Sequence, residues 1–298
     1  MLWGTGGLTG SLLARHTDLS APAVATYRLG VGGLLLVLFV AIRRRPWPAG
    51  MKAAKRTAIL GLLAALFQAG YFAAVAHLSV SLATLITIGA SPVLVLLYER
   101  RTDPRSLATL ALALAGLTLL VGVSGGGNLA GAAFALLAAA GFATLTVVGG
   151  RPVEGLDELA ATGIGFTIGA AALIPLAQVS GGLGFAPAPA SFGLLALLGI
   201  GPTAIAYAAY FRGLRTAGAG TAALMSLLEP LVGTALAVLI LGDRLGPAAV
   251  AGAGLLISAL AIEARRGTAG TARRSPPAPG TSPRGARRSP GPRRPPRP

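Results

Sequence analysis

The fold of this chain is decided by AGAGTAALMSLLEPLVGTALAVLILGDR, residues Ala217 to Arg244. Apart from small hydroxyl side chains and a charged end, the stretch is apolar, with a single carboxylate, Glu229, near its middle. As an α-helix rising about 1.5 Å per residue, it is long enough to cross a hydrocarbon core of roughly 30 Å. Glu229 and Pro230 then lie near the membrane midplane, where a charge costs about 2.5 to 3.5 kcal/mol and a proline removes a backbone hydrogen bond. We therefore expect a functional site at this Glu-Pro step.

The composition places the whole chain in a membrane. Of its 298 residues, 54% are hydrophobic and 11% are charged, which is too little charge to cover a water-soluble surface. Cysteine is absent, which excludes a disulfide framework, a thiolate nucleophile and a sulfur-ligated metal. The two histidines, His16 and His77, form no metal-binding spacing. We predict neither a metal site nor a cofactor.

Ten apolar runs of roughly membrane-spanning length follow one another along the chain. Their predicted spans are 2–15, 21–42, 58–78, 81–98, 106–123, 129–149, 158–179, 191–213, 217–242 and 246–262. The first run is short and begins at the initiator Met, so two interpretations stay open: a start further upstream, or a shortened helix. The sequence thus predicts an all-α integral membrane protein with ten transmembrane helices.

The distribution of basic residues predicts the orientation of the chain. With ten spans, both termini and the connections after the second, fourth, sixth and eighth runs share one side, which holds 22 of the 25 lysines and arginines. Arg15 and Arg244 fall on the other side, and Arg28 falls inside the second run. By the positive-inside rule, we expect a multi-pass protein of the plasma membrane with both termini in the cytoplasm.

The C-terminal segment, residues 265–298, is predicted to be a disordered Arg/Pro-rich cytoplasmic tail. Its side chains include no aliphatic group larger than alanine, so it cannot bury a core. No aromatic residue is interleaved with its arginines for base stacking. We therefore expect contact with anionic membrane lipid and no nucleic-acid partner.

An internal repeat relates the two halves of the chain. Residues 76–92, AHLSVSLATLITIGASP, align without a gap on residues 214–230, LRTAGAGTAALMSLLEP. The alignment sets Pro92 opposite Pro230, and we predict a helix kink at each of these prolines.

The repeat divides the membrane part into two five-helix units, residues 1–123 and residues 129–264. Because five is odd, the second unit enters the membrane from the opposite face. This inverted arrangement places a binding site at the interface of the repeats, near the midplane.

Two charged residues within the runs are candidates for that site. Glu229 is either a hydrogen-bonded carboxyl that holds the Pro230 kink or a group that binds a proton or a substrate amine. Arg28 either extends to the membrane surface or serves as a counter-ion for Glu229 or for a substrate carboxylate.

Polar and aromatic side chains complete the candidate set. Gln68 and Tyr71 are about one helical turn apart and share a face, and the midplane amide of Gln68 needs a partner on another helix or on a solute. Trp3 belongs either to an aromatic belt or to a cavity wall, whereas Tyr207 and Tyr210 fit the belt at the membrane surface.

Short motifs along the runs form a recognisable set. They are Trp3-Gly4, Tyr27-Arg28-Leu29, Leu228-Glu229-Pro230, Leu241-Gly242-Asp243-Arg244-Leu245, and Gly252 with Gly254 in the last run. This set resembles the drug/metabolite transporter superfamily, EamA type, over residues 1–264 and most strongly in the second repeat. The resemblance implies ten helices in two inverted five-helix repeats and a central cavity lined mainly by helices other than the fifth and tenth. It also implies export of amino acids, other metabolites or drugs.

We therefore expect an inner-membrane permease that exports a small organic solute by alternating access about Gln68, Pro92 and Glu229, with protons as the candidate coupling ion. Two other classes of protein stay open. An integral-membrane enzyme acting on lipid-linked substrates would need acids, His or Cys clustered near one membrane face, and a non-transporting scaffold would leave the midplane polar residues unexplained. The many small-residue spacings fit both internal packing and a homodimer.

Overall fold

The structure is a computed structural model that describes residues 2–101, 103–122, 128–241 and 244–274. Over these residues the chain forms helices and connections and contains no strand. The first half consists of α1 (Trp3–Thr17), α2 (Ala21–Ile42), α3 (Gly50–Val75), α4 (Val80–Tyr98) and α5 (Pro104–Val121).

The second half begins with α6 (Leu129–Gly150) and α7 (Glu158–Val179). Its eighth run comprises α8 (Pro189–Gly199), the π-helix η1 (Ile200–Ile205) and α9 (Ala206–Ala217). Its ninth run comprises α10 (Ala219–Ser226), α11 (Leu228–Leu236) and the π-helix η2 (Ala237–Leu241), and α12 (Pro247–Arg274) follows. The predicted all-α fold with two inverted five-helix repeats is confirmed.

Nine helices in the described part of the chain are long and apolar enough to cross a membrane, counting each interrupted run as one. The tenth, α1, has 15 residues, in line with the short first run of the sequence. At the other end, α12 continues to Arg274, ten residues beyond the predicted end of the second repeat. The remainder of the predicted tail, 275–298, lies outside the described residues, as do Gly242 and Asp243.

Short polar side chains fix where several helices begin. The N-cap residues Ser20, Ser79, Asp103, Asn128 and Asp157 each accept a hydrogen bond from a backbone N–H of the first turn that follows. Such a bond satisfies one of the N–H groups that a helix leaves unpaired at its start. The apolar runs therefore start where the sequence supplies these acceptors.

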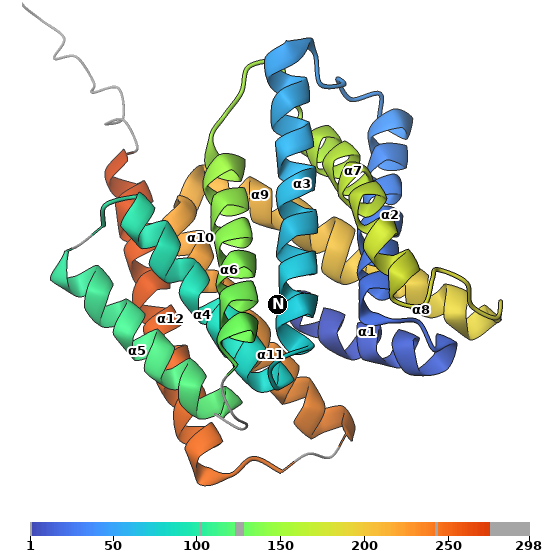
Figure 1. Ribbon diagram of the computed structural model, residues 1–298. Helices are drawn as coiled ribbons and strands as arrows, with labels where there is room; N and C mark the ends of the chain where they lie inside the picture. Colours follow the sequence, from blue (N-terminus) through green and yellow to red (C-terminus); the bar gives the residue numbers. More distant parts are fainter. Residues whose placement is uncertain (1, 102, 123–127, 242–243, 275–298) are drawn as a thin grey trace, which may run out of the picture.

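The two repeats interleave in space. In Figure 1, α2, α3 and α4 of the first repeat pack against α6 and α7 of the second, and α5 packs along α12. Glycines allow these helices to approach closely: a Cβ on Gly61 of α3 would overlap the carbonyl oxygen of Gly165 in α7. A Cβ on Gly116 of α5 would lie 2.8 Å from the carbonyl oxygen of Gly252 in α12. Because lipid tails are as apolar as the helix surfaces, van der Waals contact between closely approaching backbones contributes to the association of these helices.

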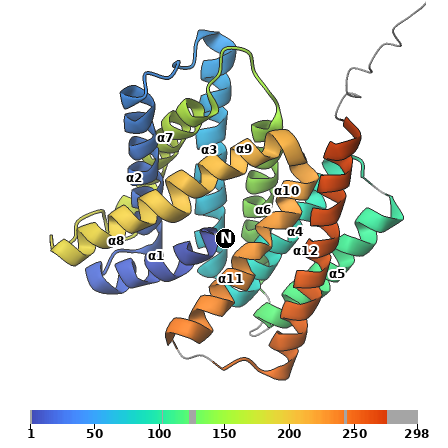
Figure 2. The same cartoon turned by 180° about the vertical axis from the view of Figure 1, so that it is seen from behind.

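The two ends of the helix bundle differ in charge. We call the end formed by connections 43–49, 99–101 and 151–157 the basic face; the first and third of these connections lie at the top of Figure 1. The opposite face carries connections 18–20, 76–79 and 180–188. Figure 2 shows α8 and α9 crossing the back of the bundle, with α1 running outward from its centre.

Candidate functional site

A cavity of about 490 Å³ lies between the two repeats, and we call it the central cavity. Its walls come from α1, α2, α3, α4 and α11, with one residue from α8. The lining extends to Ala21 and Val80, the first residues of α2 and α4, so the cavity reaches the opposite face. None of its described lining residues belongs to α5 or α12, as the family resemblance implied.

Most of the predicted site residues meet in this cavity. Glu229 and Pro230 of α11, Gln68 and Tyr71 of α3, and Arg28 of α2 all line it. The cavity therefore joins residues of the two repeats that are far apart in sequence.

The ninth run breaks at the Glu-Pro step. Leu227 separates α10 from α11, so Glu229 and Pro230 lie in the first turn of α11. The backbone N–H groups in the first turn of a helix have no intrahelical acceptor. A proline is tolerated there because its missing N–H removes no hydrogen bond. Glu229 is partly exposed to the cavity and takes part in none of the four ion pairs found between described residues.

Pro92, which aligns with Pro230, does not lie at a helix break. It is buried inside the continuous helix α4 and does not line the central cavity. Its neighbour Ser91 donates a hydrogen bond of 2.7 Å to the carbonyl oxygen of Thr87. The two aligned prolines thus lie at a helix break in one repeat and within an unbroken helix in the other.

Arg28 is directed into the bundle rather than toward the membrane surface. Its Nε donates to the hydroxyl of Thr203 at 3.3 Å, and its Nη2 donates to the carbonyl oxygen of Pro202 at 3.5 Å. Both partners belong to η1, whose irregular backbone frees carbonyl groups from the regular helical pattern. The π-helix thereby holds a guanidinium at the cavity wall.

Gln68 and Tyr71 differ in how their polar atoms are satisfied. The hydroxyl of Tyr71 shares a 2.8 Å hydrogen bond with Thr84 Oγ1, which ties α3 to α4. Gln68 is 6% exposed, and none of the hydrogen bonds between described residues uses its amide. A buried amide at a cavity wall without a protein partner is available to a solute or to water.

On the side of Glu229 that is nearer the basic face, a smaller space of about 40 Å³ adjoins the central cavity, and we call it the deep chamber. Arg28, Phe67, Thr87, Ile88 and Glu229 line both spaces. The remaining residues of the chamber wall are Trp3, Ser91, Phe142, Tyr207 and Ser226.

Trp3 is part of the chamber wall. Its ring centroid lies 4.8 Å from that of Tyr207, 4.7 Å from Tyr210 and 6.0 Å from Phe142. Tyr207 is buried at 5% exposure, and the hydroxyl of Tyr210 bonds Thr146 Oγ1 at 2.7 Å. The two tyrosines therefore line the interior of the bundle instead of the surface belt that the sequence suggested.

A third cavity of about 350 Å³ lies beyond Trp3, between the start of α1, α9 and α10. It extends toward the basic face as far as Ala217. Trp3 and Ser226 line both this cavity and the deep chamber, so they lie between the two spaces.

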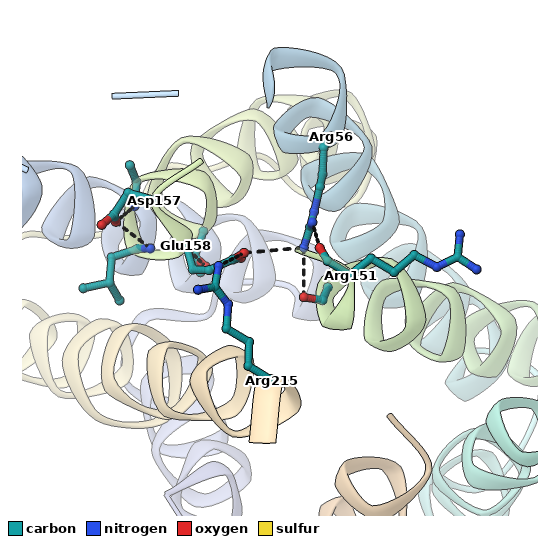
Figure 3. Close-up of polar contacts among 9 residues, drawn as sticks. Arg56, Arg151, Asp157, Glu158 and Arg215 are labelled. Carbon is teal, nitrogen blue, oxygen red and sulfur yellow. Dashed lines mark hydrogen bonds and ion pairs between the residues drawn. The ribbon is translucent and has the colours of Figure 1, made fainter. Parts of the chain in front are cut away.

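Charged side chains tie the repeats together at the basic face (Figure 3). Glu158, at the start of α7, forms ion pairs with Arg56 of α3 at 3.7 Å and with Arg215 of α9 at 2.5 Å. Arg56 is buried, and it also donates to the carbonyl oxygens of Gly149, at 2.8 Å, and Arg151.

Two further ion pairs cross between the repeats at this face. Arg45 lies 3.1 Å from Asp157, and Arg101 lies 3.9 Å from Glu263 near the end of the membrane part of α12. In addition, the backbone N–H of Gly220 donates to Glu99 at 3.0 Å. The basic face is thus closed by several polar contacts between the halves.

Sequence reasoning missed the roles of Pro202, Thr203 and Ser226 in this region. The Gly201-Pro202 dipeptide was the available signal, because such pairs interrupt regular helices. Ser226 carried no signal, since a serine in an apolar run is equally compatible with a hydrogen bond to its own helix.

Comparison with known proteins gives concordant results. The sequence model of the EamA-like transporter family matches residues 1–122 and 129–263. A Bacillus subtilis (strain 168) protein named "Uncharacterized transporter YwfM" is 30% identical over 276 residues, covering 87% of this chain and 89% of its own length. A solved structure described as "Crystal structure of protein" has a TM-score of 0.72 at 22% identity, covering 90% of this chain and 95% of its own, and so shares the fold.

Proposed function

Because the chain belongs to the EamA-like transporter family of the drug/metabolite transporter superfamily, and so is a multi-pass membrane transporter, we propose that it exports small organic solutes. Amino acids and related metabolites are the proposed solutes, with drugs as a second class. Transport proceeds by alternating access between the two repeats in the plasma membrane. The basic face is the cytoplasmic one by the positive-inside rule.

The central cavity is the observation that carries this proposal. Its lining combines apolar side chains with a carboxylate, a guanidinium and an amide contributed by Glu229, Arg28 and Gln68. Ligand sites for organic solutes have this composition, in which apolar walls supply contact area and a few polar groups supply orientation. A site at the interface of inverted repeats is also what alternating access requires.

The asymmetry between the two faces supports the transport cycle. The central cavity reaches the opposite face, while the ion pairs of Arg45, Arg56 and Arg101 hold the repeats together at the basic face. This arrangement fits a state that is open away from the cytoplasm. Access from the cytoplasm would require these contacts to separate.

Glu229 is the proposed coupling residue. It lies in the cavity wall beside a helix break, and no ion pair between described residues neutralises it. A carboxyl in this position can bind either a proton or a cationic group of the solute as the repeats rearrange.

A proteoliposome assay tests the proposal. Uptake and counterflow of amino acids, sugars and cationic drugs are measured with and without a pH gradient for the native protein, Glu229→Gln and Glu154→Gln. Glu154 is an exposed residue of the connection between α6 and α7, so its variant makes the same chemical change away from the cavity. We expect gradient-driven transport in the native protein and in Glu154→Gln, with loss in Glu229→Gln.

Each other outcome rejects a stated part of the proposal. Gradient-driven transport that survives Glu229→Gln removes Glu229 from coupling. No movement of any solute by correctly folded native protein argues against export of these classes and favours the enzyme or scaffold alternatives.

A further inference from the structure

We propose that the deep chamber is a seat for a primary ammonium group, so that the transporter selects solutes bearing a primary amine over their trimethylated, quaternary forms. The inference rests on the proposed function, because the seat serves the solute that is carried.

Three buried hydroxyl groups give the chamber its acceptors. Thr87 Oγ1 donates to the carbonyl oxygen of Ala135 at 3.2 Å, and Ser226 Oγ donates to that of Ala223 at 2.6 Å. Ser91 Oγ donates at 2.7 Å to the carbonyl oxygen of Thr87. A hydroxyl has one proton to donate and two lone pairs to accept with. Since all three protons are used on backbone carbonyls, the oxygens of these side chains remain as acceptors.

The fourth acceptor is the carboxylate of Glu229. When ionised it accepts hydrogen bonds and donates none, and it lies in no ion pair among the described residues. An ammonium group has the complementary inventory of three donors and no acceptor. The three hydroxyl oxygens and Glu229 therefore match the three donors of an ammonium group, and Glu229 supplies the opposite charge.

Aromatic rings add a further attraction for a cation. The rings of Trp3, Phe142 and Tyr207 line the chamber, with Trp3 packed against the other two. The face of an aromatic ring attracts a cation within about 6 Å of its centroid, most strongly for tryptophan.

Arg28 is the one cationic side chain in the described lining of the chamber. Its guanidinium is held by Thr203 and Pro202 on η1, and it lines the junction between the chamber and the central cavity. An anionic group attached next to the amine would meet Arg28 at this junction. The rest of the solute would extend into the wider central cavity.

The size of the chamber sets the selectivity. Its volume of about 40 Å³ admits a group of one to three non-hydrogen atoms, given that roughly 10–15 Å³ suffices for a water molecule. An ammonium group fits this space, whereas a trimethylammonium group does not. Methylation also replaces the donors that the hydroxyl oxygens and Glu229 require.

Intrinsic fluorescence provides a direct test, because the chain has two tryptophans and one of them lines the chamber. The other, Trp47, is 48% exposed in the connection between α2 and α3, so Trp47→Phe leaves Trp3 as the reporter. Purified Trp47→Phe protein is titrated with methylammonium chloride and with tetramethylammonium chloride, and sodium chloride controls for ionic strength. We expect a saturable change in Trp3 fluorescence with methylammonium alone.

Variants of two serines separate binding from general effects on the protein. In the Trp47→Phe background, Ser226→Ala should weaken methylammonium binding about tenfold, the usual effect of losing one hydrogen bond to a charged group. Ser258→Ala should leave binding unchanged, because Ser258 donates to the carbonyl oxygen of Gly254 at 2.8 Å on the exposed side of α12. Size-exclusion profiles establish that each variant is folded.

The proposal is overturned by an absent response to methylammonium, by an equal response to tetramethylammonium, or by equal affinities of the two serine variants. Failure of the seat is distinguishable from failure of the transport function. Transport of solutes without methylammonium binding rejects the seat alone, and methylammonium binding without transport of any solute rejects the transport function alone.

Discussion

At the scale of single residues, the two polar side chains that α3 contributes to the central cavity have different roles. Tyr71 is bonded to Thr84 and so supports the packing of α3 on α4. Gln68 is buried and makes no hydrogen bond within the described residues. One side chain stabilises the fold, and the other is available for a ligand.

This difference predicts different effects on stability. Gln68→Met should leave the thermal unfolding midpoint nearly unchanged, because the Gln68 amide faces the central cavity and makes no hydrogen bond within the described residues. The same variant should weaken solute binding about tenfold in counterflow assays. Tyr71→Phe should instead lower stability by about 1 kcal/mol. A large loss of stability in Gln68→Met would indicate a structural role for the amide.

Some residues of the site could be predicted from the sequence, and others could not. Glu229, Gln68, Tyr71 and Arg28 could be chosen because each is polar in an apolar run, and all four line the central cavity. Ser226 and Thr87 could not be chosen in this way, because hydropathy does not report which face of a helix a hydroxyl occupies. Their convergence depends on how α4 and α10 are rotated about their axes, which tertiary packing determines.

At the scale of helices, the apolar runs predicted the elements well where a cap defines the start. The predicted spans 21–42 and 158–179 coincide with α2 and α7, which follow the caps Ser20 and Asp157. In contrast, α3 begins at Gly50 instead of residue 58. The first turns of α3 carry basic side chains and can be helical outside the hydrocarbon core. A search for apolar runs leaves such turns out, because it selects residues by hydropathy alone.

The two aligned prolines give a prediction at this scale. Pro92→Ala removes a proline from the interior of α4, where it costs up to about 3 kcal/mol, so the unfolding midpoint should rise. Pro230→Ala changes the first turn of α11, where no backbone hydrogen bond is lost, and its midpoint should shift little. Differential scanning fluorimetry of the two purified variants measures both shifts. A rise for Pro230→Ala equal to that for Pro92→Ala would contradict the assigned break.

At the scale of the whole molecule, the ion pairs of the basic face join the two repeats where the central cavity does not reach. Glu158 is central to this contact, because it receives arginines from α3 and α9. Removing one member of a buried ion pair leaves the other charge unpaired and costs about 3–5 kcal/mol.

Labelling of a single cysteine can report on this face, because the chain has none of its own. Ala161 is fully buried one turn after Glu158 and packs with Ala53 of the other repeat. In an Ala161→Cys background, Glu158→Gln should raise the rate of maleimide labelling at least severalfold, because the repeats separate more often at this end. Glu154→Gln supplies the control, and equal rates in the two variants would show that Glu158 does not hold the face closed.

The contact between Gly61 and Gly165 has a mechanical consequence. At this crossing the backbones of the two repeats touch, with no side chain between them to deform. If the repeats rock against each other, such a crossing is the natural fulcrum, and the parts of the helices on either side act as lever arms. Displacement would then be smallest at the glycines and largest at the two membrane faces, so a modest rotation could close one mouth while opening the other.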